Sequence, residues 1–221
     1  NTRGGLNTNN ATRYRGVAEL AVTADLDRLF GTTGTSVFIN AGQMHGNSIS
    51  VRDVGDWQFV SNIDSSPFPH LTQLNEYWLS QKLGETIWFK VGRIDANADF
   101  GFADLAGDFT NSSFGQMPTI PLPVWPTQSL GATGFVNLTD DLLLAAGTYK
   151  GNTMAANWGS PVFDALGYVT LGHLELKTAA GRNELPGTWR IGSWYQSGDW
   201  KEITAAPAAR TFVDNYGVWC T

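Results

Sequence analysis

Six charged residues lie on or beside predicted β-strands, where their side chains could contact a polar, hydroxyl-rich solute. Arg93 and Asp95 are two positions apart in one predicted strand, so regular alternation puts both side chains on the same face. An arginine donates hydrogen bonds from a planar fork and a carboxylate accepts them, which suits dense hydroxyl groups. The other four residues are Glu76, Lys90, Glu175 and Arg190. For each of the six, the alternative is a structural ion pair that contacts no solute.

Regular alternation along the strand that carries Arg93 conflicts with a polar face. Three apolar residues share the parity of this arginine: Ile87, Phe89 and Val91. Lys90 would then face the opposite side from Arg93. A polar face therefore requires that the strand ends near Val91 or contains a bulge, which would re-aim the side chains that follow.

Known catalytic and cofactor motifs do not explain these residues. The sequence contains no P-loop, no Gly-x-Gly-x-x-Gly and no Gly-x-Ser-x-Gly stretch. The three histidines are isolated and lack the spacing of metal ligands: His45, His70 and His173. Four acids could supply the pair that glycoside hydrolysis needs: Glu76, Asp95, Asp99 and Glu175. Since their spacing does not show that any two face each other, we expect no catalytic residue, no metal and no cofactor.

The composition favours a β protein with one polar and one apolar face. The 221 residues include 25 Gly and 9 Trp, and only 15% are charged, compared with about 25% in ordinary soluble domains. The net charge of −6 argues against a nucleic-acid partner, and the single cysteine excludes a disulfide framework. No apolar run approaches the roughly 18 residues of a transmembrane helix, but a barrel crosses a membrane with short alternating strands.

Apolar residues and acids alternate with period two over residues 16–27, which predicts a first strand. We expect Leu20 and Val22 to face lipid, and Glu19 and Asp25 to face the interior. A helix is the alternative, because Ala, Leu and Glu are good helix formers.

Further strand-like segments recur along the whole chain. A second strand follows a turn at 31–34 and runs through Val37, Ile39 and Ala41. Seven more strands are predicted, over residues 71–83, 87–95, 129–138, 142–150, 168–178, 188–197 and 212–220. Several of the nine tryptophans lie near predicted strand ends, where the aromatic girdles of membrane barrels are found. The alternative at this point is a soluble β-sandwich with an aromatic core.

The predicted connections differ in length. Those at 84–86, 139–141 and 181–187 are short, whereas 97–128 is long and contains four prolines. Short turns at one end and long loops at the other are typical of an outer-membrane barrel. The long segment is either an inward or an extracellular loop. Its five aromatic residues favour an inward fold that narrows a channel, because exposed aromatic side chains are unusual unless they are packed.

Several motifs in collinear order resemble those of the carbohydrate-selective porin family, the OprB-type outer-membrane channels. These are LNEYWLSQKL at 74–83, FKVGRID at 89–95 with DF at 99–100, and DFTNSSF at 108–114. GGL at 4–6, DLDRLFG at 25–31 and GTWRIG at 187–192 are similar to the same family. The resemblance implies an all-β fold, a transmembrane antiparallel β-barrel of about sixteen strands when complete. Residues 1–221 would supply roughly the N-terminal half of this single barrel domain.

The resemblance also implies a function. The protein would be a bacterial outer-membrane porin for passive, sugar-preferring diffusion, with the six charged residues named above lining the pore. Its partners would be saccharides or other small solutes and outer-membrane lipid, and it would be a monomer or a homo-oligomer such as a trimer. The alternatives are a soluble secreted glycan-binding or glycan-cleaving β-sandwich, and an ion-conducting or envelope-scaffold barrel of the same family.

Overall fold

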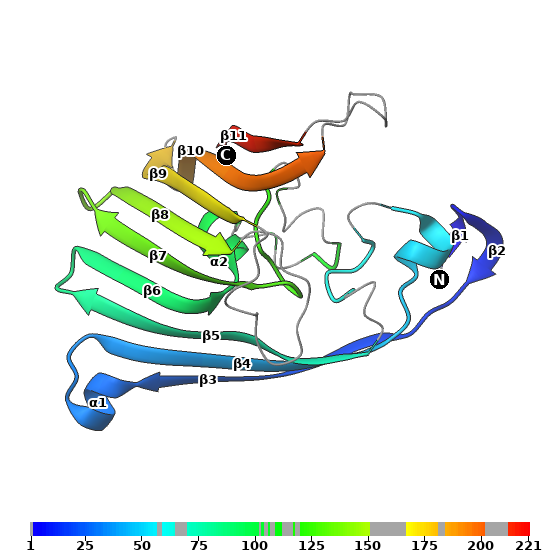
Figure 1. The fold of residues 1–221 in the computed structure, drawn as a ribbon, viewed down its shortest axis with the longest axis horizontal. Coiled ribbons are helices and arrows are strands. Elements are labelled where there is room, and N and C mark those ends of the chain that lie inside the picture. The colour runs from blue at the N-terminus through cyan, green and yellow to red at the C-terminus, as the bar shows by residue number, and fades with distance from the viewer. Residues whose placement is uncertain are drawn as a thin grey trace.

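The computed structural model describes residues 2–56, 59–64, 70–101, 103, 106, 109–111, 117, 120–150, 167–180, 184–201 and 212–221. Its main feature is one antiparallel sheet of nine strands in the order β3 to β11, in which every strand pairs with the next along the chain (Figure 1). The strands are β3 (Arg15–Asp25), β4 (Thr35–Gly46), β5 (Leu71–Leu83), β6 (Ile87–Ile94), β7 (Ser129–Asn137), β8 (Leu142–Lys150), β9 (Tyr168–Ala180), β10 (Leu185–Lys201) and β11 (Phe212–Cys220). A separate small sheet pairs β1 (Thr2–Gly4) with β2 (Asn7–Ala11).

The connections confirm the predicted difference between the two ends of the sheet. At one end the strands are joined by 84–86, 138–141, 181–184 and the nine residues 26–34, which include α1 (Leu26–Phe30). At the other end, 47–70 contains the π-helix η1 (Ser50–Val54) and 95–128 contains α2 (Ala96–Phe100), while 151–167 and 202–211 are also long. We call these the short-turn end and the long-loop end.

Most predicted strands agree closely with the observed ones, but β10 runs over Leu185–Lys201 where 188–197 was predicted. The bounds 71–83, 142–150 and 212–220 are the observed bounds of β5, β8 and β11. The first strand ends at Asp25 rather than at residue 27, because Asp25 is the N-cap of α1. Its Oδ1 accepts hydrogen bonds from the N–H groups of Asp27 (3.1 Å) and Arg28 (3.3 Å). Asp25 thus caps α1 at the short-turn end, with its side chain 51% exposed.

The convex face of the sheet is apolar. Leu20 and Val22 of β3 are 69% and 54% exposed, which confirms their predicted outward orientation. Across β8 to β11 one outward row runs Leu144, Leu174, Ile191, Cys220, with each residue directly opposite the next. Exposed apolar side chains in contiguous rows indicate a face that contacts lipid rather than water. Among the described residues, no helix is long and apolar enough to cross a membrane.

The concave face is covered by side chains from the sheet and from the segment 95–128. Figure 1 shows the strands curving around this side, with α2 beside β7 and β8. One buried cluster unites Phe100 and Ile120 of that segment with strand residues such as Tyr149, Leu171 and Trp194. The described strands form one curved sheet with an apolar outer face, so the soluble β-sandwich alternative was wrong.

Candidate functional site

Two irregularities in adjacent strands determine which polar side chains reach the concave face. The first is a bulge in β5, where Asn40 pairs with Glu76 but Ala41 pairs with Leu74. Asn75 is therefore an extra residue without an opposite partner on β4. Before the bulge the odd-numbered Gln73 is buried, and after it the even-numbered side chains turn to the concave side.

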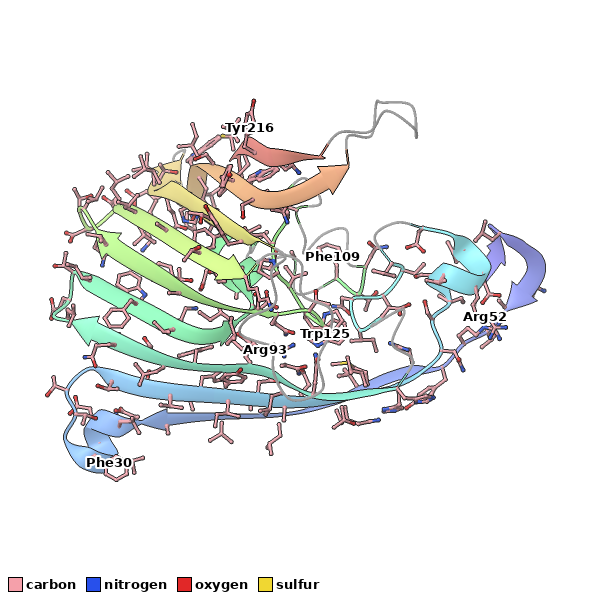
Figure 2. The ribbon with its side chains drawn as sticks, viewed as in Figure 1. Phe30, Arg52, Arg93, Phe109, Trp125 and Tyr216 are labelled. Atoms are coloured by element: carbon pink, nitrogen blue, oxygen red, sulfur yellow. The ribbon has the colours of Figure 1, made fainter. Side chains whose placement is uncertain are left out.

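The second irregularity is Gly92 in β6. Its φ of 149° lies in the region that favours glycine, and a Cβ there would lie 2.1 Å from the carbonyl oxygen of Tyr77. Beyond Gly92, Arg93 and Ile94 are both buried. Figure 2 shows Arg93 on the concave side. Lys90 also contacts concave-side groups, so the expectation that Lys90 and Arg93 face opposite sides was wrong.

Lys90 forms an ion pair with α2 above aromatic rings of the wall. Its Nζ lies 2.5 Å from Asp99 Oδ1, and both side chains are largely buried. The same ammonium lies 5.3 Å from the ring centroid of Trp78 and 5.8 Å from that of Phe135, within cation–π range. Lys90 thus attaches the inward segment to β6 and places a positive charge against an aromatic wall.

Those rings belong to two stacked pairs on neighbouring strands. Phe38 stacks on Trp78 with centroids 5.0 Å apart, and Trp88 stacks on Phe135 with centroids 4.9 Å apart. The ring planes diverge by 25° in the first pair and by 8° in the second. They give the concave wall from β4 to β7 a series of flat apolar surfaces beside the charged cluster.

Asp95 joins both ends of the segment 95–128 to the sheet. Its backbone N–H donates to Glu76 Oε2 on β5 at 3.0 Å. Its Oδ1 accepts from the N–H of Asn97 at 2.9 Å, and its Oδ2 accepts from the N–H of Trp125 at 3.1 Å. Nearby, the N–H of Ala96 donates to the carbonyl of Pro123 at 3.0 Å.

Burial changes the acidity of the two aspartates in this segment. Burial of the carboxylate, followed by the nearby negative charge of Glu76, raises the pKa of Asp95 to about 7. Burial also raises the pKa of Asp99, although Lys90 opposes the shift. Asp95 therefore gains or loses its charge near neutral pH.

Arg93 is 0% exposed and belongs to a chain of polar side chains. Its Nη2 donates to Gln73 Oε1 at 3.5 Å, and Gln73 Nε2 donates to the carbonyl of Pro126 at 2.8 Å. Gln73 Nε2 also donates to Asn75 Oδ1 at 3.0 Å, and Asn75 Nδ2 donates to Glu19 Oε1 at 3.0 Å. These bonds link β3, β5 and β6 to the end of the inward segment, and they place Glu19 on the interior side as expected.

Glu175 and Arg190 form a second group, on β9 and β10. They are directly opposite in register, and Arg190 Nε lies 2.7 Å from Glu175 Oε2. Next to Glu175 along the same face of β9, His173 makes edge contacts with the rings of Phe100 (5.2 Å) and Trp219 (6.3 Å). The six predicted residues thus form one group of four at the inward segment and one pair on the opposite part of the wall.

Sequence reasoning did not place several polar residues in this site. Thr133 and Tyr149 hydrogen-bond to each other beside Asp99. Gln73 and Asn75 were not among the candidates, and Asp99 was named only as a possible catalytic acid, not as a pore-lining residue. The bulge that brings Gln73 and Asn75 inward has no signature in the sequence. Asp99 reaches Lys90 because it lies in the short helix α2, which the sequence analysis did not predict.

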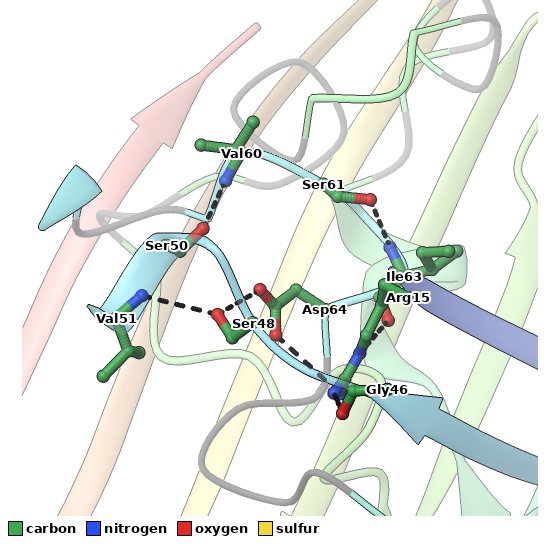
Figure 3. A network of polar contacts seen from close by, with 9 residues as sticks. All are labelled: Arg15, Gly46, Ser48, Ser50, Val51, Val60, Ser61, Ile63 and Asp64. Atoms are coloured by element: carbon green, nitrogen blue, oxygen red, sulfur yellow. Dashed lines mark hydrogen bonds and ion pairs between the residues drawn. The ribbon is translucent and has the colours of Figure 1, made fainter. Parts of the chain in front are cut away.

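A further polar network fixes the loop 47–64 to the long-loop end of the sheet (Figure 3). The Arg15 guanidinium donates to the carbonyls of Gly46 (3.1 Å) and Ile63 (3.4 Å) and lies 3.8 Å from Asp64. Ser48 donates to the same Asp64 carboxylate. This loop also contacts the segment 95–128, because the N–H of Asn62 donates to the carbonyl of Thr110 at 2.7 Å.

No group of three or more His, Cys, Asp or Glu side chains is arranged to hold a metal ion in the part of the chain that the structure describes.

Comparisons with known proteins agree with this geometry. Residues 9–215 match the model of the family described as "Carbohydrate-selective porin, OprB family". A solved structure of Pseudomonas putida OprB at high pH superposes with a TM-score of 0.80 at 20% sequence identity, over 100% of this chain and 57% of that one. The chain therefore spans somewhat more than half the length of that porin. None of the curated proteins matches the chain. OprB family members are channels of the bacterial outer membrane, not enzymes, and this chain belongs to the carbohydrate-selective porin, OprB family.

Proposed function

We propose that this chain forms part of an outer-membrane porin that allows passive diffusion of small solutes and prefers sugars. The observation that carries the proposal is the contrast between the two faces of one sheet. The outer face is a continuous apolar belt, whereas the inner face has charged and aromatic side chains around an inward-packed segment. A wall of this kind separates lipid from a polar passage.

The segment 95–128 is the proposed constriction, and residues 1–221 belong to one barrel domain in this account. Phe100 and Ile120 of the segment pack against strand residues on the inner face. Lys90, Asp95 and Gln73 attach its two ends to β5 and β6. A segment held at both ends occupies part of the cross-section, so it limits the size of solutes that pass.

The preference for sugars follows from the groups that border this segment. Glu76, Lys90, Glu175 and Arg190 supply charged donors and acceptors on the inner wall, and the stacked rings supply flat apolar surfaces. A sugar has hydroxyl groups around its rim and apolar C–H faces, so it can use both kinds of contact. Arg93 and Asp95, in contrast, are occupied in holding the segment. We assign them the role of shaping the pore.

The remaining partners follow from the outer face and from the position of the constriction. The apolar belt, with Tyr168 and Tyr195 close together at the long-loop end (6.1 Å between ring centroids), suits outer-membrane lipid and its interface. Since the constricting segment packs on the sheet of its own chain, solute passage takes place within one chain, in a monomer or in a homo-oligomer such as a trimer.

The test is sugar block of ion current through the complete protein in planar bilayers. We expect monosaccharides and disaccharides to reduce the current reversibly, and the variant Glu175→Gln/Arg190→Gln to weaken the block by roughly tenfold, which corresponds to one or two lost hydrogen bonds of about 1 kcal/mol each. The matched control is Arg28→Gln, which removes a highly exposed charge at the short-turn end. Ion conduction without any sugar block would instead support the ion-conducting alternative.

A further inference from the structure

The carboxylate of Asp95 joins the two ends of the inward segment to each other. One oxygen binds the N–H of Asn97 at the start of α2, and the other binds the N–H of Trp125, thirty residues further along the chain. The backbone N–H of the same residue is bound to Glu76 on β5. Figure 2 shows Trp125 on the concave side with Arg93, away from the outer face. Asp95 therefore holds the two ends of the segment together and fixes the first of them to β5.

We propose that Asp95 is a positioning residue for the constriction, and that its protonation state sets how firmly the inward segment is attached and hence how wide the pore is. The inference rests on the proposed porin function. It assigns no direct contact between Asp95 and the solute. Instead, it makes pore width depend on pH.

The charges that face Asp95 come from several elements. Glu76 on β5 and Asp99 on α2 both act on it with like charge. Lys90 on β6 is paired with Asp99, Tyr149 lies nearby on β8, and Arg93, on the same strand as Lys90, is bound to Gln73. An ionised Asp95 thus adds a third carboxylate to a partly desolvated group whose adjacent cation is already paired. A proton on Asp95 removes that repulsion.

The direction of the effect follows from linkage. Burial and the charge of Glu76 raise the pKa of Asp95 from 3.8 to about 7 in the attached state. When the segment detaches, the carboxylate of Asp95 becomes hydrated and its pKa returns toward the ordinary value. The attached state therefore binds the proton more tightly. Attachment is therefore strongest below about pH 4. As the pH rises from there, the equilibrium constant for attachment falls by up to about tenfold per pH unit, and it reaches its lowest value above pH 7.

The experiment is single-channel conductance of the complete protein between pH 5 and pH 9. We expect conductance to rise with pH, with a midpoint below 7, and to level off above pH 7. The variant Asp95→Asn cannot ionise, so its conductance should stay at the low-pH value of the wild type throughout. Glu76→Gln should shift the midpoint to lower pH, because it removes a like charge while its amide oxygen can still accept from the N–H of Asp95. Asp99→Asn should shift it in the same direction by a smaller amount.

A second readout does not depend on the Asp95 variant folding. In a Cys220→Ser background, the exposed Phe109 of the inward segment can be replaced by cysteine and its rate of thiol labelling measured, after correction for the reagent's own pH dependence. We expect labelling to accelerate as the pH rises to 7 and to level off above it. A conducting channel whose conductance and labelling are both independent of pH would overturn the role of Asp95 and leave the porin function intact. A protein that forms no channel at any pH would overturn the porin function itself.

Discussion

Glu175 on β9 and Arg190 on β10 occupy directly opposite positions and form an ion pair of 2.7 Å on the inner face. Their side chains are only 13% and 17% exposed, so each charge depends on the other for its solvation. In contrast, Arg28 and Asp25 at the short-turn end are paired at 3.3 Å with side chains 88% and 51% exposed. The two pairs allow a direct comparison of a buried and an exposed ion pair in one protein.

Replacing Arg190 with Met should destabilise the folded protein by about 3 kcal/mol, because it leaves the Glu175 carboxylate without its cation. The double variant Glu175→Met/Arg190→Met should recover most of this loss. Arg28→Met should change stability by less than about 1 kcal/mol. Urea unfolding in detergent, followed by tryptophan fluorescence, measures all three. Additive effects of the two single substitutions at 175 and 190 would show that the side chains are not coupled.

Lys90 is expected to control the charge preference of the pore. It lies between Asp99 and the aromatic wall, and it also interacts electrostatically with Glu76. Lys90→Met removes its positive charge and leaves the acids, so the pore should become more selective for cations. The reversal potential in a salt gradient reports this change. Lys82→Met, which removes an exposed lysine at the short-turn end of β5, is the matched control and should leave the reversal potential close to that of the wild type.

Gly92 should be among the most sensitive of the strand glycines. Its positive φ and the 2.1 Å approach of a Cβ to the Tyr77 carbonyl predict that Gly92→Ala costs about 3 kcal/mol or more. Gly134, on the adjacent β7, has open space where its Cβ would lie, so Gly134→Ala should be nearly neutral. Thermal unfolding of both variants tests the assignment. Equal and small effects would mean that β6 does not need glycine to turn Arg93 inward.

The sequence predicted the bounds of several strands, but it did not predict the direction of the side chains next to Gly92. The period-two pattern, bounded by turn residues, located β5, β8 and β11 to the residue. The same rule failed at Arg93, because alternation does not reveal a bulge at Asn75 or a glycine with positive φ. Sequence reasoning did mark this place as doubtful, since apolar residues shared the parity of Arg93.

The remaining omissions have a similar cause. The strands β1 and β2 and the π-helix η1 are built from polar residues without a clear period, so no hydrophobic pattern predicts them. The link from Gln73 to Pro126 and the link from Asp95 to Trp125 join residues far apart in sequence. Residue types alone could nominate Glu76, Lys90 and Glu175 as inner-face charges, but only the fold shows which group each one contacts.

The assignment of faces can be tested with two neighbouring residues of β5. Leu79 faces outward and is directly opposite Val37 and Val91, whereas Ser80 is opposite Lys90 on the inner side. Leu79→Arg should cost about 2–4 kcal/mol of folding free energy in lipid if the position lies near the middle of the membrane, and Ser80→Arg should cost much less. Folding yields into lipid vesicles give the comparison. The reverse order of effects would invert the faces of the sheet.

The most direct test of the central claim is swelling of liposomes that contain the complete protein in iso-osmotic solute. We expect rapid swelling with monosaccharides, slower swelling with disaccharides, and slower entry of a zwitterionic amino acid than of a sugar of comparable size. Swelling rates that depend on solute size alone would contradict the sugar preference, and the absence of swelling with every solute would contradict a porin.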